Sequence, residues 1–184
     1  MIEIIDYIPL ERDNPKTANV PTAWGDIPTI LKDIINRFNI NPKKALEFGI
    51  QYGYSTSALA NYFEEVIGID TFTGDIHAGI EENFFERTKN NLKEYNNIKL
   101  IESSYQNYIV NRIEHYDLIH IDIVHTYEDT YACGEWAVNN SNIVIFHDTE
   151  SFPDVRRACT DLAEKHNLRF YNYKPSYGLG ILTK

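Results

Sequence analysis

The stretch from Lys44 to Asp70 reads K-A-L-E-F-G-I-Q-Y-G-Y-S-T-S-A-L-A-N-Y-F-E-E-V-I-G-I-D. A short apolar run enters a turn that contains Gly49 and Gly53, a helical pattern follows from about Tyr54, and a second apolar run ends at Asp70. This order predicts a strand, a glycine turn, a helix and a second strand. Such a unit builds a parallel sheet with a ligand crevice at the carboxyl ends of its strands.

The rest of the chain continues this alternation of strand and helix. A helix is expected from Ile27 to Phe38 with Asp26 as its cap, whereas prolines interrupt the irregular stretch before it. The predicted fold class is a Rossmann-like, doubly wound α/β domain with a mainly parallel seven-stranded sheet and a C-terminal antiparallel hairpin. Further helices are expected at about 81–95, 105–113, 127–138 (with Thr126 as its cap) and 151–166, and further strands at 98–101, 116–122, 142–148, 168–173 and 179–183.

The length and composition are those of an ordinary globular protein. A chain of 184 residues fits one domain, so we expect a single domain in which residues 1–26 form an N-terminal arm or lid. No apolar run approaches the ~20 residues of a membrane span, and the first residues lack the pattern of a signal peptide. A cytoplasmic location is therefore expected. Cys133 and Cys159 are interpreted as reduced packing residues.

The charge of the chain limits its partners. A net charge of −10 and a pI of about 5.0 argue against a nucleic-acid-binding surface, because phosphate contacts need clustered Lys and Arg. A neutral or cationic small ligand is the easier partner.

Polar residues follow four of the expected strands, where α/β sheets bind their ligands. They are Glu47 to Gly49, Asp70, Asp122, and His147 with Asp148. The turn E-F-G-I-Q-Y-G-Y-S lacks the G-x-G-x-x-G spacing that seats a pyrophosphate on a helix N-terminus, so a dinucleotide fits poorly. Asp70 ends the second strand, where a carboxylate can accept hydrogen bonds from both hydroxyls of an adenosine ribose. The alternative is that Asp70 is a solvated turn residue.

Five ordered stretches between Leu46 and Leu182 carry a more specific resemblance. They are L-E-F-G-I-Q-Y-G-Y-S-T, G-I-D-T-F-T-G-D-I-H-A-G, L-I-H-I-D-I-V-H-T-Y-E, I-V-I-F-H-D-T and Y-G-L-G-I-L. In them the chain resembles the class I S-adenosylmethionine-dependent methyltransferases, and within these a small O-methyltransferase group with D-x-x-H-x-Y-E after the fourth strand and F-H-D-T after the fifth. The order of the stretches carries the resemblance, because a lone E-x-G-x-x-x-G is weak evidence.

The resemblance implies a binding site for the cofactor S-adenosylmethionine. In this family the turn after the first strand shapes the pocket for the methionine part, and the aspartate that ends the second strand holds the ribose. The residues after the third strand would lie near the adenine. The implied cofactor-binding residues are Glu47, Gly49, Gly53, Ser55, Asp70, Ser103, Ser104 and Asp122.

Methyl transfer to a hydroxyl needs an acceptor that is aligned behind the methyl group and relieved of its proton, so a base or a metal ion is required. Asp122 and His125 lie at one strand end, and His147 with Asp148 ends the neighbouring strand, so all four can face one crevice. Related antibiotic-sugar O-methyltransferases use a histidine matching His125 as the base. His125 and Asp122 are therefore the candidate catalytic residues.

The same relatives bind magnesium through an aspartate matching Asp122 and an acidic pair matching His147 and Asp148. His147 departs from that pattern, since magnesium prefers oxygen ligands to imidazole. The metal candidates Asp122, His147 and Asp148 leave three alternatives open: magnesium, another divalent ion (manganese, iron or zinc), or catalysis without a metal, in which Asp148 orients His125.

The function expected from the sequence is S-adenosylmethionine-dependent O-methylation of a small-molecule hydroxyl, with a sugar or glycoconjugate among the candidate acceptors. A dinucleotide-dependent oxidoreductase of the NAD type and a non-catalytic cofactor-binding or partner-binding domain are the alternatives. His120 is expected to be a packed core residue. His77 either reaches the acceptor or is an ordinary loop histidine. A homo-oligomer in which the arm completes the partner's site is a further hypothesis.

Overall fold

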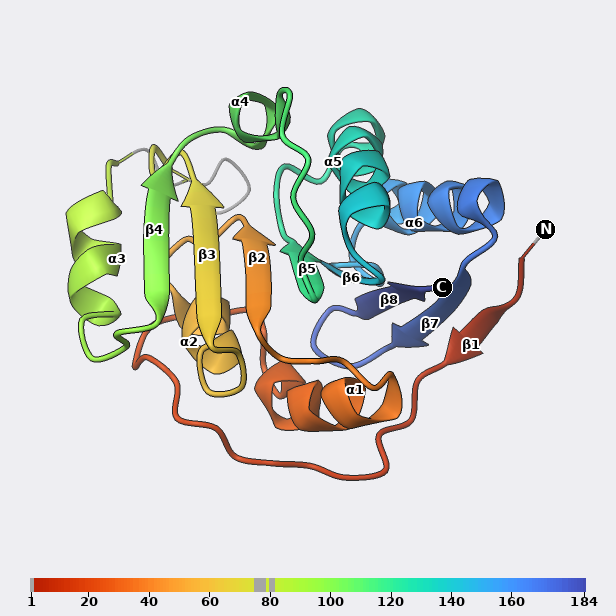
Figure 1. Ribbon diagram of the computed structural model, residues 1–184, viewed down its shortest axis with the longest axis horizontal. Coiled ribbons are helices and arrows are strands. Elements are labelled where there is room, and N and C mark those ends of the chain that lie inside the picture. Colours follow the sequence, from red (N-terminus) through yellow and green to blue (C-terminus); the bar gives the residue numbers. More distant parts are fainter. Residues whose placement is uncertain (1, 75–78, 80–81) are drawn as a thin grey trace.

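A computed structural model describes residues 2–74, 79 and 82–184, and an eight-stranded sheet forms its centre (Figure 1). The strand order is β1-β7-β8-β6-β5-β2-β3-β4. The strands are β1 (Ile4–Asp6), β2 (Lys44–Phe48), β3 (Glu65–Asp70), β4 (Ile98–Glu102), β5 (Leu118–Ile121), β6 (Ile143–His147), β7 (Arg169–Tyr173) and β8 (Leu179–Thr183). The helices are the 3-10 helix η1 (Ile27–Ile30), α1 (Leu31–Arg37), α2 (Tyr54–Leu59), α3 (Phe85–Asn91), α4 (Tyr105–Ile109), α5 (Tyr127–Asn140) and α6 (Pro153–His166).

The directions of the strands confirm the predicted α/β class. β8 lies between β6 and β7 and runs antiparallel to both, whereas the other neighbouring strands pair in parallel. The order reverses direction between β2 and β5, since β3 and β4 lie on one side of β2 and the later strands lie on the other. Such a switch point opens a crevice at the carboxyl ends of the strands.

The prediction of seven strands was wrong, because the segment before Gly25 contributes an eighth. Ile4 pairs with Phe170 and Asp6 with Asn172, so β1 extends the sheet in parallel beyond β7. A three-residue strand ahead of Pro9 has too little alternation to be detected in the sequence. It forms because the edge of β7 offers unpaired backbone groups.

Apolar side chains cover both faces of the sheet, as a doubly wound fold requires. One face packs against α5 and α6 and includes Leu46 and Phe48 of β2, together with the free, buried Cys133 and Cys159. The other face packs against η1, α1 and α2 and includes Ala45. Alternate residues of β2 thus point into opposite cores, and the polar residues that follow the strands are left at the sheet's end.

Helix positions agree with the sequence better than helix ends do. Thr126 caps α5 as predicted, since its Oγ1 accepts a hydrogen bond from the Asp129 N–H at 3.1 Å. The expected cap Asp26 makes no such bond, because Arg12, Tyr173 and Ser176 bind its carboxylate instead. The helices expected at 81–95 and 105–113 are shorter, at Phe85–Asn91 and Tyr105–Ile109; residue 81 and His77 lie outside the described residues.

The N-terminal arm passes along the outside of α1 and reaches the pocket at its end (Figure 1). It is anchored at Tyr7, whose hydroxyl donates to the buried Asp33 carboxylate, and at Ala18, whose N–H donates to Ser57 Oγ at 2.9 Å. Trp24 ends the arm with only 2% of its surface exposed. In the described part of the chain, no helix has the length and apolarity needed to cross a bilayer.

Candidate active site

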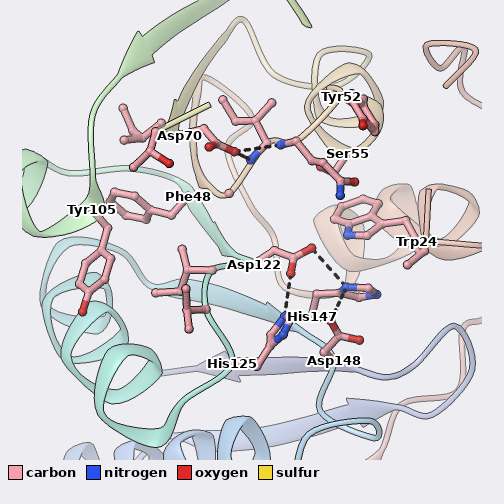
Figure 2. A pocket seen from close by; sticks show the side chains of 18 of the residues that line it. Trp24, Phe48, Tyr52, Ser55, Asp70, Tyr105, Asp122, His125, His147 and Asp148 are labelled. Carbon is pink, nitrogen blue, oxygen red and sulfur yellow. Dashed lines mark hydrogen bonds and ion pairs between the residues drawn. The ribbon is translucent and has the colours of Figure 1, made fainter. Parts of the chain in front are cut away.

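A cavity of about 930 Å³ lies at the carboxyl ends of the central strands, a size that suits a small ligand (Figure 2). Most of the predicted site residues line it, but Glu47 and Gly53 do not. Residues 21–24 of the arm contribute one wall. The predicted residues that line the cavity are Gly49, Ser55, Asp70, Ser103, Ser104, Asp122, His125, His147 and Asp148.

The turn after β2 needs glycine for reasons of backbone packing. Gly49 has φ +83°, and a Cβ there would lie 1.7 Å from the carbonyl oxygen of Asp122. Gly53 has φ +93°, and a Cβ there would come within 2.8 Å of the Leu92 side chain. Left-handed backbone with no room for a side chain leaves glycine as the only residue that fits either position. At Gly49 the turn therefore passes directly against the backbone of Asp122, which follows β5.

Asp70 organises two loops at the rim of the cavity. Its Oδ2 accepts hydrogen bonds from the N–H groups of Ile50 at 2.7 Å and Gln51 at 2.9 Å, and its Oδ1 accepts from the N–H of Phe72 at 2.7 Å. Burial raises the pKa of the Asp70 carboxyl above its usual value, although the three N–H groups oppose that shift. A carboxylate has about four acceptor positions, so one on Oδ1 remains available to a ligand hydroxyl.

Glu47 lies beneath the cavity and has no exposed surface. Its Oε1 accepts a hydrogen bond from His120 Nδ1 at 2.9 Å, and its Oε2 accepts one from the Thr56 hydroxyl. His120 is itself fully buried, which confirms it as a core residue. Glu47 thus stabilises the floor of the cavity by holding His120 and Thr56 in place.

Four side chains from two adjacent strands form a compact cluster, as Figure 2 shows. His125 Nε2 lies 3.0 Å from Asp148 Oδ2 and 3.4 Å from Asp122 Oδ1. His147 Nδ1 lies 3.2 Å from Asp122 Oδ2 and 3.4 Å from Asp148 Oδ2. The cluster therefore alternates two carboxylates with two imidazoles around one corner of the cavity.

The charges in this cluster stabilise one another. Burial disfavours the charged form of His125, but its hydrogen bonds to Asp122 and Asp148 outweigh burial and raise its pKa to about 9. The same balance raises the pKa of His147 to about 10. Burial also opposes ionisation of Asp122 and Asp148, yet the imidazoles hold the pKa of each carboxyl below its usual value.

Neighbouring residues fix the orientation of both imidazoles. His147 Nε2–H donates to the carbonyl oxygen of Ser176 at 3.1 Å, which turns Nδ1 toward the carboxylates. The ring of His125 stacks on Phe152, with centroids 4.1 Å apart and planes 22° apart. Phe152 was missed in the sequence, because nothing in its local pattern indicates which histidine its ring would meet.

Ser103 and Ser104 follow β4 and line the far end of the cavity. The Ser104 hydroxyl accepts a hydrogen bond from the Asn107 N–H at 3.2 Å and so caps α4. Ser103 Oγ donates to the Ser104 carbonyl oxygen at 3.0 Å. Trp24 also lines the cavity and was not predicted there, although a tryptophan in a polar, proline-rich arm was a signal that this segment packs on the domain.

The comparison with known families decides the class of the chain. The family described as a methyltransferase domain matches residues 46–149, more than half of the sequence. The chain belongs to this methyltransferase family. The predicted membership of the methyltransferases is thereby confirmed. No curated protein sequence gives a significant match.

Solved structures of methyltransferases share the fold. An O-methyltransferase from Bacillus cereus in complex with SAH is 16% identical, with 92% of this chain and 84% of that chain covered and a TM-score of 0.65. The SAH-bound Podospora anserina methyltransferase PaMTH1 is 14% identical, with 92% and 90% covered and a TM-score of 0.63. The O-methyltransferase NovP is 13% identical, with 88% and 78% covered and a TM-score of 0.70.

Proposed function

We propose that this protein transfers a methyl group from S-adenosylmethionine to a hydroxyl of a small molecule, with His125 as general base. The observation that carries the proposal is the placement of His125 between two carboxylates in the same cavity as Asp70. In a methyltransferase-family chain, this arrangement supplies a cofactor site and a proton acceptor within one crevice. The SAH complexes of the structural neighbours support the choice of cofactor.

The cofactor would lie across the carboxyl ends of β4, β3 and β2. Asp70 would accept a hydrogen bond from the ribose, and Ser103 and Ser104 would border the adenine. The sulfonium would then lie near Asp122, whose N–H continues the β5 ladder by donating to the Phe48 carbonyl oxygen at 2.8 Å. In this placement the adenine, the ribose and the sulfonium each have their own neighbouring residues, and the side of the cavity at His125 is left for the acceptor.

In the proposed reaction, the acceptor oxygen attacks the methyl carbon while the carbon–sulfur bond breaks. His125 takes the hydroxyl proton, and the products are a methyl ether, S-adenosylhomocysteine and protonated His125. Asp122 and Asp148 stabilise the resulting imidazolium, as their 3.4 Å and 3.0 Å contacts with Nε2 indicate. Because the pKa of His125 is about 9, its neutral form becomes more abundant as the pH rises from 7 toward 9.

The donor set also fits a divalent metal ion. Asp122, His125 and Asp148 each offer one ligand atom, and these three atoms lie within 4.8 Å of one another. His147 Nδ1 lies 3.2 Å from Asp122 and 3.4 Å from Asp148. A mixture of imidazole and carboxylate suits manganese or another transition ion better than magnesium. Asp122, Asp148 and one imidazole would hold it, and a bound ion would lower the pKa of the acceptor hydroxyl.

The lining of the cavity favours an acceptor without phosphate groups. Neither Lys nor Arg occurs among the described lining residues, and the two lining histidines are already paired with carboxylates. An anionic acceptor would therefore find no free cation there. A sugar or another neutral polyhydroxyl molecule is the acceptor class that we propose.

The test is release of S-adenosylhomocysteine from S-adenosylmethionine across a panel of sugars and catechols, with and without manganese. The His125→Ala variant should lose roughly 100-fold or more of the transfer rate while it still binds the cofactor. His166→Ala is the matched control, because His166 bonds Glu135 on α5 and does not line the cavity. An unchanged rate in His125→Ala would refute the role of His125 as general base. Calorimetric binding of NAD instead of S-adenosylmethionine would favour an oxidoreductase.

A further inference from the structure

Trp24 carries a polar atom that the fold leaves without a partner. Its side chain is 2% exposed, and its indole Nε1 makes no hydrogen bond to any described residue. A buried N–H without an acceptor is destabilising, so a native structure that retains one calls for a bound water or ligand. Figure 2 shows the indole nitrogen directed into the cavity, on the side of Asp122 and His147.

The position of Trp24 is held from two directions. Its ring packs edge-on against buried His120, with centroids 4.8 Å apart, and His120 is in turn bound to Glu47. Its backbone N–H donates to Thr22 Oγ1 at 3.0 Å, and its carbonyl oxygen accepts from the Ile27 N–H at 3.0 Å. The indole N–H is therefore presented to the cavity by a fixed backbone and a fixed ring.

A polar latch holds the arm next to Trp24 onto the turn before β8. Asp26 accepts hydrogen bonds from Arg12 at 2.8 Å, from the Tyr173 hydroxyl at 2.6 Å and from the Ser176 hydroxyl at 2.6 Å. The Ser176 carbonyl oxygen also accepts from His147, so one turn positions both the arm and the reaction cluster. These hydrogen bonds hold the end of the arm in place, where residues 21–24 line the cavity.

The proposed cofactor has a carboxylate that needs donors in this cavity. With the ribose at Asp70 and the sulfonium near Asp122, the amino-acid end would extend to the side of the cavity that Ser55 and residues 21–24 line. A buried carboxylate must be hydrogen-bonded, and the described lining offers it no Lys or Arg. Neutral donors must therefore bind it, and the unpartnered Trp24 N–H lies at this end.

We propose that Trp24 binds the methionine carboxylate of S-adenosylmethionine by donating a hydrogen bond from its indole Nε1. This inference rests on the proposed function and gives the N-terminal arm a role in cofactor binding. The Trp24 hydrogen bond would favour ligands that carry the methionine carboxylate and would not depend on their adenosine part.

Calorimetry with S-adenosylmethionine and decarboxylated S-adenosylmethionine tests the proposal, since the two ligands differ only in the carboxylate. Trp24→Phe keeps an aromatic ring against His120 but removes the donor. It should weaken S-adenosylmethionine binding by roughly tenfold or more and change binding of the decarboxylated ligand by less than about twofold. Equal effects on both ligands, or none on either, would overturn the proposal. Failure of both ligands to bind the wild-type protein would instead refute the proposed function and this inference with it.

A second measurement on the wild-type protein covers the case in which Trp24→Phe does not fold. The chain has only two tryptophans, so two indole N–H resonances are expected in a nitrogen-15 correlation spectrum, and Trp136→Phe assigns them. The Trp24 resonance should move downfield with S-adenosylmethionine and stay in place with the decarboxylated ligand. The Trp136 resonance is the control, because its Nε1–H already donates to the Arg112 carbonyl oxygen at 3.0 Å. A Trp24 resonance that responds alike to both ligands contradicts the carboxylate contact.

Discussion

The two ends of the same parallel strands carry clusters of charge with different surroundings. At the amino end of β2, Lys44 pairs with Glu114 and lies 3.7 Å from Glu65. Glu114 also accepts hydrogen bonds from Arg112 at 3.1 Å and from the Tyr116 hydroxyl at 2.7 Å. At the carboxyl end, the charges of the Asp122 cluster instead line a cavity.

This difference separates charges that stabilise the fold from charges that are available to a ligand. The amino-end carboxylate of Glu114 has three protein donors around it. The carboxyl-end cluster pairs acids with bases in a cavity, where the proposed acceptor hydroxyl would exchange hydrogen bonds with them. Backbone geometry contributes to the difference, since the glycine turn after β2 opens space at the carboxyl end.

The largest expected effect is on the methyl-transfer rate, and it should differ between the two aspartates that flank β5. Asp117 N–H donates to the Lys44 carbonyl oxygen, and Asp122 N–H donates to that of Phe48, so the two residues are backbone equivalents at opposite ends. Asp122→Asn should lower the methyl-transfer rate roughly 100-fold, because the imidazolium of His125, the proposed base, loses a carboxylate partner. The measurement is release of S-adenosylhomocysteine at saturating cofactor.

Asp117→Asn is the matched control for that variant. Its carboxylate accepts the Lys44 N–H at 2.8 Å and lies far along the strand from the cavity, so the rate should stay within about twofold of wild type. Equal losses of rate in both variants would mean that the two ends of β5 do not divide into structural and functional roles.

A smaller effect is expected at Asp70, on the cofactor side of the carboxyl end. Asp70→Asn replaces one carboxylate oxygen by an amide group that cannot accept the N–H groups now bound there. Affinity for S-adenosylhomocysteine should fall by roughly tenfold, as isothermal titration calorimetry can measure. Unchanged affinity would show that the three backbone contacts are the whole role of Asp70.

The smallest effect is expected at the amino end and concerns stability alone. The hydrogen bond from Lys44 is the main cause that lowers the pKa of Glu114 from 4.5 to about 2. Burial opposes this shift, whereas hydrogen bonds from Tyr116 and Arg112 add to it. Its carboxylate thus stabilises the fold above pH 4.5, and this contribution is lost as the pH falls toward 2. Since a third of the side chain is exposed, Glu114→Gln should lower the free energy of unfolding at pH 7 by roughly 1 kcal/mol.

Urea unfolding at pH 7 and pH 3 checks this pH dependence. The difference between wild type and Glu114→Gln should shrink at the lower pH, and cofactor affinity should be the same for both proteins. Glu82→Gln is the control, because its 3.5 Å pair with Arg87 is exposed and should contribute little. A constant difference across the pH range would mean that the ionisation of Glu114 does not stabilise the fold.

Local sequence patterns predicted the site residues that lie at the ends of strands. Asp70, Asp122, His147 and Asp148 were identified because parallel strands bring their carboxyl ends to one edge of the sheet, and the structure places all four in one cavity. The contact of His125 with Phe152 could not be predicted, because it joins the loop after β5 to the segment that precedes α6. Side-chain packing of this kind has no periodic signal.

The N-terminal segment shows the same limit more sharply. Its prolines indicated irregular backbone, yet they contain no information about which surface that backbone meets. β1 pairs with a strand near the other end of the chain. Trp24 packs against His120 at the cavity, and the N–H of the nearby Asp26 bonds the turn at Ser176. Each of these contacts depends on the completed sheet.

The α/β class, the order of its elements and the residues at the strand ends thus follow from the amino-acid order alone, because apolar periodicity and turn chemistry are local properties. The eighth strand, the burial of Glu47 beneath the cavity and the direction of the Trp24 nitrogen came from packing. They depend on residues far apart in the chain, whose proximity is set by the folded backbone and not by any spacing along it.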